Sequence, residues 1–262
     1  MTSKTEPRLL CYDLGEGVTA FSTTRHGGVS EANYASFNIN PYCGDSADHV
    51  ARNRQLLADR LGLPASHIVL PHQVHGIEHR AVAPELLDMS DAVRDKILDG
   101  VDMVTTSMTG VCIGVSTADC IPVLLYDPVA RATAAIHAGW RGTLQRICQR
   151  AVMAMQLHYG TTPDRLRAVV GPGISLANFE VGQEVYDQFL QAGFDLTETA
   201  EWHTKWHLDL PGINIRELIG CGVAPEHIHH ADICTFDHAD DYFSARRLGI
   251  DSGRIYTGIL MR

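Results

Sequence analysis

The stretch DMVTTSMTGVCIGVSTADCIPVLLYDPVARATAAIH, residues 102–137, decides the fold class. It holds short apolar runs at 102–106, 111–116, 121–127 and 132–137, with turn residues between them. Apolar runs of this length, bounded by turn residues, are typical of strands that are buried on both faces. The stretch therefore predicts four adjacent, well-buried strands.

Further helices and strands are expected on both sides of this stretch. Strands are predicted at residues 17–24, 68–74, 228–234 and 254–260, and helices at 48–61, 143–159, 180–191 and 211–221. Gly160 provides a stop signal for the helix at 143–159. The order lacks a regular βαβ rhythm, which argues against a Rossmann fold or a barrel. We expect one α/β domain over residues 1–262, in which mixed sheets form a sandwich covered by helices.

Composition and charge exclude several classes of protein. The chain has 262 residues, 45% of them hydrophobic, and a formal net charge of −10 without a basic run, so we expect no nucleic-acid partner. No stretch approaches the ~18 apolar residues of a membrane span, and the polar start lacks the apolar core of a signal peptide. The seven cysteines have irregular spacings and no CxxC pair, which is typical of reduced thiols. We therefore expect a cytoplasmic protein with no membrane association and no obligate protein partner.

Three short segments carry residues that can bind a metal at predicted strand ends: 71–76 (PHQVHG), 117–120 (TADC) and 136–142 (IHAGWRG). His75, Cys120 and His137 supply two imidazoles and one thiolate, a donor set that zinc favours. Three protein ligands would leave a fourth position open, as in catalytic zinc sites. Taken one at a time, the cysteine also fits a packing role and each histidine a structural one.

The first of these segments contains two histidines. His72 and His75 are three residues apart, so on an extended strand they would point to opposite faces. They can share one ion only if the chain turns between them. His75 precedes Gly76 at the expected strand end, which is the better position to face an open pocket. We therefore expect His75 to be the ligand.

Several arginines lie beside glycines or a helix start. Arg25 precedes two glycines, Arg141 lies at the start of the helix after His137, and Arg246 is followed by Arg247. Glycines allow backbone N–H groups to approach an anion, and a helix start contributes a positive dipole. Together these residues predict a phosphate site, although each arginine alone also fits a solvated loop.

Motif blocks along almost the whole chain closely resemble the laccase-domain family of YfiH-type proteins. This family was first described as multicopper polyphenol oxidases and later as purine nucleoside phosphorylases. The matching blocks are residues 22–30 (STTRHGGVS), 37–38 (FN), 43–45 (CGD), 53–54 (NR), 73–76 (QVHG), 117–120 (TADC), 137–142 (HAGWRG), 171–172 (GP), 179–182 (FEVG), 234–235 (CT), 243–244 (FS) and 246–247 (RR).

The resemblance implies that His75, Cys120 and His137 bind zinc, with Cu2+ as an alternative metal. It also implies an α/β/β/α sandwich of mixed sheets, similar to the fold of cysteine-hydrolase toxins. The implied activity is phosphorolysis of adenosine, inosine, guanosine and methylthioadenosine, with some adenosine deamination. The expected partners are therefore a small-molecule nucleoside and phosphate.

Other residues are expected to assist. Asp119, next to Cys120, is expected either to orient a ligand histidine or to carry a proton. Residues expected to bind substrate or phosphate are Arg25, Asn38, Arg141 and Arg246. Ala245 stands where many relatives carry an aromatic residue, and Gly173 where many carry another small residue. These departures leave purine selectivity open.

Three alternative functions remain at this point. A copper-dependent polyphenol oxidase, or laccase, needs a large set of histidines with several His-x-His pairs, and the only such pair here is His227 with His229. A metal-free hydrolase would use Cys120 and His137 to cleave an amide, for example in editing peptidoglycan precursors. A non-catalytic metal-binding or partner-binding module would not require an open ligand position surrounded by arginines.

Overall fold

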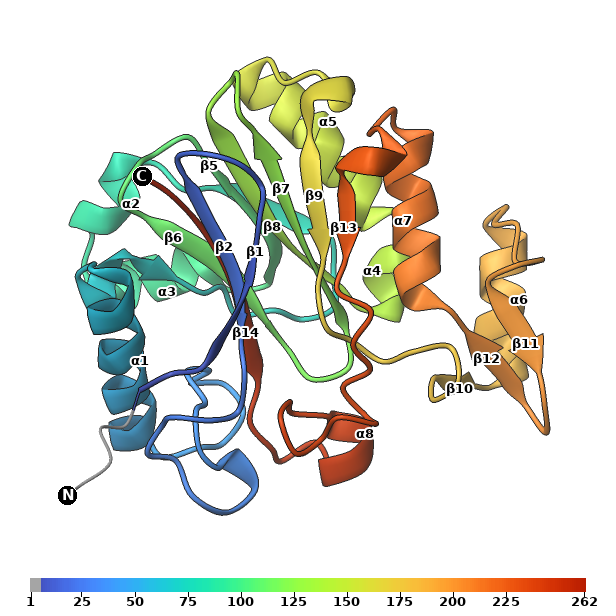
Figure 1. The fold of residues 1–262 in the computed structure, drawn as a ribbon, viewed down its shortest axis with the longest axis horizontal. Coiled ribbons are helices and arrows are strands. Elements are labelled where there is room, and N and C mark those ends of the chain that lie inside the picture. Colours follow the sequence, from blue (N-terminus) through green and yellow to red (C-terminus); the bar gives the residue numbers. More distant parts are fainter. Residues whose placement is uncertain (1–5) are drawn as a thin grey trace.

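Two mixed β-sheets packed face to face form the centre of the molecule, and helices cover both outer faces (Figure 1). A computed structural model describes residues 6–262. The four predicted central strands are β5 (Val101–Thr106), β6 (Cys112–Thr117), β7 (Ile121–Asp127) and β8 (Ala132–Ala138), and every residue in them is buried. This layering confirms the α/β/β/α sandwich.

The larger sheet has six strands in the order β13-β9-β7-β8-β5-β4. Its outer members are β13 (Ile228–His230), β9 (Arg167–Val170) and β4 (Glu78–Ala81). The central strands β9, β7, β8 and β5 pair antiparallel, whereas β4 and β13 join the two edges in parallel pairings.

The other sheet has five strands in the order β1-β2-β14-β6-β3. These are β1 (Leu9–Tyr12), β2 (Val18–Thr23), β14 (Ile255–Met261), β6 and β3 (Ile68–Val69). The chain therefore passes between the two sheets several times. The chain crosses from β6 to β7 in the three residues 118–120, and from β3 to β4 in residues 70–77. Both crossings contribute to the candidate site.

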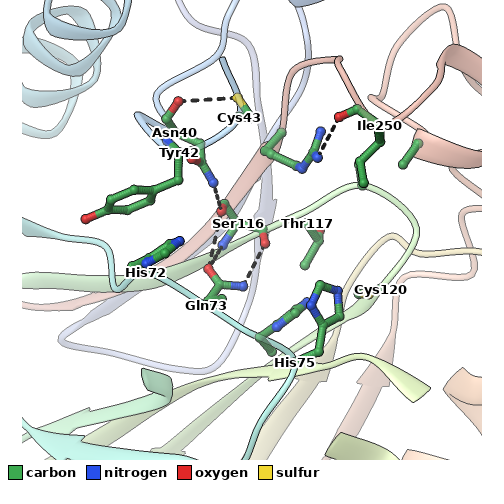
Figure 2. Close-up of a pocket in the computed structure, with 14 residues that line it drawn as sticks. Asn40, Tyr42, Cys43, His72, Gln73, His75, Ser116, Thr117, Cys120 and Ile250 are labelled. Carbon is green, nitrogen blue, oxygen red and sulfur yellow. Dashed lines mark hydrogen bonds between the residues drawn. The ribbon is translucent and has the colours of Figure 1, made fainter. Parts of the chain in front are cut away.

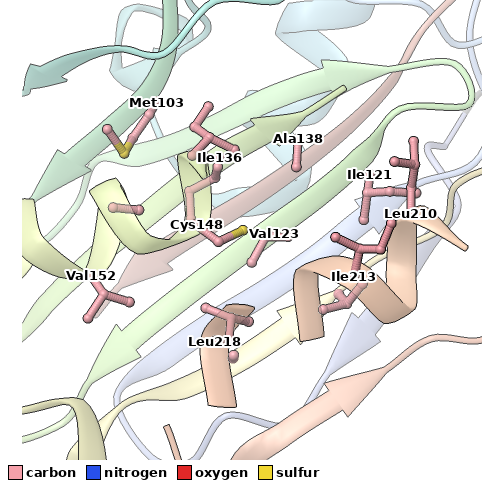
Figure 3. Packing of buried hydrophobic residues seen from close by; sticks show 14 of the residues in the cluster. Met103, Ile121, Val123, Ile136, Ala138, Cys148, Val152, Leu210, Ile213 and Leu218 are labelled. Carbon is pink, nitrogen blue, oxygen red and sulfur yellow. The ribbon is translucent and has the colours of Figure 1, made fainter. Parts of the chain in front are cut away.

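The strands alternate between two apolar layers because successive side chains point to opposite faces. On β7, Val123 and Leu125 pack toward the helices, whereas Leu124 and Tyr126 pack between the two sheets. Figure 3 shows the helix-side layer, where side chains from the sheet meet those of the flanking helices. Its helices are α4 (Trp140–Leu144), α5 (Ile147–Tyr159) and α7 (Leu210–Gly220). On the opposite side of the molecule, α1 (Ala47–Leu61) covers the five-stranded sheet.

Smaller elements complete the described part of the chain. A three-stranded sheet, ordered β10-β12-β11, lies with α6 to the right of the two main sheets in Figure 1. The bounds are β10 (Glu180–Val181), α6 (Gln183–Gln191), β11 (Ala200–Trp202) and β12 (Trp206–Leu208). The short helices are α2 (Pro84–Asp88), α3 (Asp91–Leu98) and α8 (Ala245–Leu248). Within residues 6–262, no helix has the length and apolar character needed to cross a membrane.

Four of the predicted elements differ by more than one residue in their extent. The strand predicted at 228–234 ends at His230. The helix predicted at 143–159 is divided, because Arg146 adopts a left-handed backbone conformation (φ 60°) between α4 and α5. The helix predicted from residue 180 begins at Gln183, because Glu180 and Val181 pair with β12. The strand predicted at 68–74 ends at Val69, because its parallel partner β6 lies beside only Ile68 and Val69. The last difference changes the geometry around His75.

Candidate metal centre

The side chains of His75, Cys120 and His137 converge where the chain crosses between the two sheets. His137 lies on β8, Cys120 directly precedes β7, and His75 lies in the crossing from β3 to β4. The atoms that could bind a metal lie within 4.8 Å of one another, and the two histidine rings meet edge to face with centroids 4.8 Å apart. Figure 2 shows His75 and Cys120 at one end of a pocket. Three residues distant in the sequence thus form one cluster.

His75 is oriented by a turn and not by strand alternation. Its backbone is left-handed (φ 62°), a conformation that L-residues adopt only when the surroundings fix it. The buried carboxylate of Asp102 accepts hydrogen bonds from the backbone N–H groups of Val74 (3.2 Å), His75 (3.0 Å) and Gly76 (2.7 Å). The chain turns between His72 and His75, because the strand β3 ends at Val69. The choice of His75 was therefore right, but the alternation of side chains along a strand is not its reason.

His137 is held by the same carboxylate. Its Nδ1 lies 2.7 Å from Oδ1 of Asp102, and both side chains are almost completely buried. The pairing of Met103 with Ile136 makes Asp102 and His137 the next neighbours across β5 and β8. A carboxylate can only accept, so Nδ1 carries the proton and Nε2 is free to face the cluster. Asp102 was not among the residues expected from the sequence, although an aspartate within a buried apolar strand is a signal of a buried polar partner.

The cluster changes the protonation of its members. Burial favours the neutral thiol of Cys120, but the charge and hydrogen bonds of His137 and His75 outweigh it and lower the pKa of Cys120 from 9.0 to about 6. Burial opposes the charge on His137, but the Cys120 thiolate and Asp102 raise its pKa from 6.5 to about 9. Burial would raise the pKa of Asp102, but the hydrogen bonds from His137 and the loop hold it below 3.8. At neutral pH the sulfur is therefore a thiolate, which is the form that binds metals and attacks electrophiles.

The residues fit a zinc ion. Two imidazoles and one thiolate are a donor set that zinc favours, and three protein ligands would leave a fourth position open. Gly139 leaves room for this set, because a Cβ on it would come within 2.9 Å of Cδ2 of His75 and 3.1 Å of Sγ of Cys120. The described part of the chain contains no other cluster of three such side chains.

A cavity of about 210 Å³ opens beside the cluster, and all three residues of the cluster line it. Tyr42 and His72 form part of its wall, with ring centroids 4.2 Å apart. Gln73 is fixed there by Ser116, because its Oε1 accepts from the Ser116 N–H (2.7 Å) and its Nε2 donates to the Ser116 carbonyl (2.8 Å) (Figure 2). Arg254 also lines this cavity and places a positive charge beside it.

Asp119 contacts neither ligand histidine. Its carboxylate accepts from Oγ1 of Thr235 (2.7 Å) and from the backbone N–H of Arg246 (2.7 Å), and its own backbone is left-handed (φ 88°). It therefore connects the crossing next to Cys120 to Thr235 and to the start of α8. The orientation of a ligand histidine, which the sequence analysis considered for Asp119, is performed by Asp102.

The structure does not bring the expected substrate-binding residues into this cavity. The guanidinium of Arg25 donates to the carbonyls of Ala35 and Ala239, and that of Arg246 donates to the carbonyl of Glu180. Arg141 stacks on the ring of Trp140. Asn38 is buried and donates to Oδ2 of Asp45 (2.9 Å). Arg254 went unnoticed in the sequence because the cavity wall it joins is formed only by the fold.

The fold and the cluster define a class: a mixed α/β sandwich with an open, three-ligand His/Cys/His centre in a cavity. A family model described as multi-copper polyphenol oxidoreductase laccase matches residues 19–262. The chain belongs to this family, which confirms the resemblance found in its motifs.

Named relatives and solved structures agree with this assignment. A purine nucleoside phosphorylase of Bacteroides thetaiotaomicron is 44% identical over 247 residues, covering 93% of this chain and 92% of the relative. Adenosine deaminase RL5, from an unknown prokaryotic organism, is 40% identical over 248 residues, covering 93% and 94%. The crystal structure of the Bacillus licheniformis hypothetical protein YfiH has a TM-score of 0.90 at 28% identity, covering 98% of this chain and 97% of that one.

Proposed function

We propose that this chain is a zinc-dependent purine nucleoside phosphorylase that acts on adenosine, inosine, guanosine and methylthioadenosine, with adenosine deamination as a side activity. The observation that carries the proposal is the open His75/Cys120/His137 cluster in the wall of a cavity. The names of the relatives from Bacteroides thetaiotaomicron and of adenosine deaminase RL5 support both activities.

His75, Cys120 and His137 would hold the ion, which when bound supplies Lewis-acid chemistry at this end of the cavity. The Tyr42–His72 pair offers an aromatic face for the purine. In phosphorolysis, an oxygen of phosphate forms a bond to C1′ of the ribose while the bond from C1′ to the purine nitrogen breaks. The purine leaves with the bonding electrons and takes up a proton at a ring nitrogen. In deamination, water adds at C6 and ammonia leaves.

Arg254 is the residue we assign to phosphate. Its guanidinium donates to the carbonyls of Ser252 (2.6 Å), Gly253 (3.0 Å) and Ile250 (3.0 Å), which are neutral acceptors. Within residues 6–262, no carboxylate pairs with it, so its charge is available to an anion in the cavity. This assignment replaces Arg25 and Arg246, whose guanidinium groups point to carbonyls outside the cavity.

A phosphate titration tests the proposal. Adenosine consumption should rise with phosphate and yield adenine with ribose 1-phosphate, measured by chromatography of the products. Removing one charge-assisted contact costs ~1.5–3 kcal/mol, or roughly ten- to a hundredfold in an equilibrium constant. Arg254→Gln should therefore raise the phosphate KM by about that factor and leave deamination nearly unchanged. Arg141→Gln is the matched control, since Arg141 does not line the cavity. Adenine release that is independent of phosphate would disprove the phosphorylase.

A specific observation also favours a second candidate, a thiol hydrolase that cleaves amides such as those of peptidoglycan precursors. Without metal, the Cys120 thiolate, His137 and Asp102 form the nucleophile, base and orienting carboxylate of a hydrolase triad. The effect of zinc on activity distinguishes the two candidate functions. Zinc should activate a phosphorylase, whereas it should inhibit a hydrolase by occupying the thiolate. Activity that increases after treatment with a chelator would favour the hydrolase.

The copper oxidase named in the family description has less support. A multicopper centre requires several groups of histidines, and the structure of residues 6–262 gathers one group of three metal-binding side chains. His229 and His230 are exposed on β13, away from this group. A phenol oxidation assay with added Cu2+, run beside the nucleoside assay, distinguishes these activities directly.

A further inference from the structure

The buried carboxylate of Asp102 connects two segments that each supply a metal-binding histidine. Oδ1 accepts from Nδ1 of His137 (2.7 Å) and from the N–H of His75 (3.0 Å). Oδ2 accepts from the N–H groups of Val74 (3.2 Å) and Gly76 (2.7 Å). The residue is fully buried, so these four donors replace the water that a carboxylate otherwise needs.

We infer that Asp102 is the positioning residue of the metal centre: it fixes the tautomer of His137 and the turn that carries His75. Because Nδ1 of His137 donates to Asp102, Nε2 is the nitrogen that faces the cluster and would bind the ion. Because three consecutive N–H groups converge on the same carboxylate, His75 is held in its left-handed conformation with its ring toward Cys120. One side chain thus sets the direction of two ligands.

Only a carboxylate satisfies this arrangement. Each of its oxygens faces two donors, whereas the amide of an asparagine has one oxygen and one NH₂ group. In either amide orientation the NH₂ group would face two N–H donors. The least costly relief is for His137 to lose the proton on Nδ1 and accept a hydrogen bond there. Its remaining proton then lies on Nε2 and blocks metal binding.

The inference rests on the metal-centre part of the proposed function, and its tests use no nucleoside. The first test uses the unaltered protein labelled with ¹⁵N-histidine and loaded with zinc. We expect His137 to bind zinc through Nε2 while Nδ1 keeps a slowly exchanging proton. The N–H groups of Val74, His75 and Gly76 should exchange slowly with solvent, although they lie outside a regular strand. Coordination through Nδ1 of His137, or rapid exchange of these three N–H groups, would overturn the inference.

The second test compares Asp102→Asn with Asp127→Asn. Asp127 is a matched control, because it is also fully buried and accepts from backbone N–H groups, those of Val129 (2.8 Å) and Ala130 (3.0 Å), at the far end of β7. Loss of a group that orients a metal ligand typically lowers affinity about ten- to a hundredfold. Chelator competition should show that decrease for Asp102→Asn only, while both variants lose thermal stability.

The outcomes are distinct. If the unaltered protein binds no zinc, the metal-centre proposal itself fails. If it binds zinc and Asp102→Asn binds zinc as tightly, Asp102 has only a structural role and the inference fails. If Asp102→Asn does not fold, the resonances of His137 in the unaltered protein decide the question.

Discussion

The thiol of Cys120 has different neighbours from the other cysteines of the chain. Two imidazoles adjoin it and lower its pKa to about 6. Cys112, in contrast, is buried in the apolar layer beneath α1, and burial raises the pKa of its thiol to about 12. The same side chain is thus reactive in one place and inert in another.

This difference predicts selective alkylation of the metal-free protein. The thiolate of Cys120 is present above its pKa and is lost as the pH falls through about 6. Iodoacetamide should therefore modify Cys120 at pH 7, and the rate should fall to half near pH 6. Zinc should suppress the reaction, and peptide mass spectrometry identifies the site. The exposed Cys11 serves as an internal control. A Cys120 that reacts no faster than Cys11 at pH 7 would contradict the electrostatic account.

The two histidines of residues 71–76 should respond differently to substitution. His75 belongs to the cluster, so His75→Ala should lower zinc affinity by more than the roughly hundredfold seen for orienting residues. Nδ1 of His72 lies 2.6 Å from Oδ1 of Asp99, and His72 lies outside the cluster. His72→Ala should therefore retain zinc. Elemental analysis after gel filtration measures both. The reverse order would show that the crossing from β3 to β4 folds differently.

At the scale of elements, the ends of the helices are set by backbone conformation. α5 ends at Tyr159, and the next residue, Gly160, is left-handed (φ 67°) and donates its N–H to the carbonyl of Gln156. Gly220 is the last residue of α7 and lies outside the left-handed region. A Cβ would meet nothing within 4 Å at either position. Backbone conformation alone should therefore decide the effect of adding one.

Gly160→Ala and Gly220→Ala should change stability in opposite directions. In Gly160→Ala the side chain disfavours the left-handed backbone, which should lower the free energy of unfolding by about 1 kcal/mol. Gly220→Ala should raise it by up to about 1 kcal/mol, because alanine favours the helix and restricts the unfolded chain. Urea denaturation followed by circular dichroism measures both. Equal effects would mean that local packing, and not the backbone, determines the change.

At the scale of the whole molecule, the three side chains of the cluster lie where the chain crosses between the two sheets. Cys120 is the last residue of the crossing from β6 in the five-stranded sheet to β7 in the six-stranded sheet, and His137 lies on β8 of the six-stranded sheet. An ion bound between them should resist separation of the sheets. Its binding energy then adds to the stability of the fold, because the unfolded chain has no formed site.

Zinc should therefore stabilise the protein against heat. At a free concentration of about 100 times Kd, a ligand that binds only the folded state contributes about 2.7 kcal/mol. For a chain of this size that corresponds to a rise in Tm of roughly 5–10 °C. Differential scanning calorimetry should show this rise, and a chelator should reverse it. Cys120→Ala should show none. An unchanged Tm in the unaltered protein, with zinc bound, would mean that the centre does not couple the sheets.

The central strands and the family were predictable because their signals are local. The apolar runs of residues 102–137 matched β5 to β8 to within one residue at every boundary, since burial of neighbouring side chains shows directly in composition. Short elements such as β4 and β10 were not predicted, because their pairing depends on strands far away in the sequence. The division of α4 from α5 was also missed, because Arg146 gives no breaker signal of the kind that glycine or proline gives.

The sequence by itself determined the fold class and, through its family motifs, indicated the three side chains that could bind a metal. Hydrophobic periodicity and short motifs are properties of residues and their near neighbours in the chain. The tertiary structure decided why His75 and not His72 lies in the cluster, because the turn depends on Asp102, a residue 27 positions away. It also decided that Asp102, and not Asp119, orients His137, and that Arg254 replaces Arg25 and Arg246 at the cavity. A buried polar group takes its partner from whichever segment the packing brings beside it, and that choice is made by long-range pairing of strands.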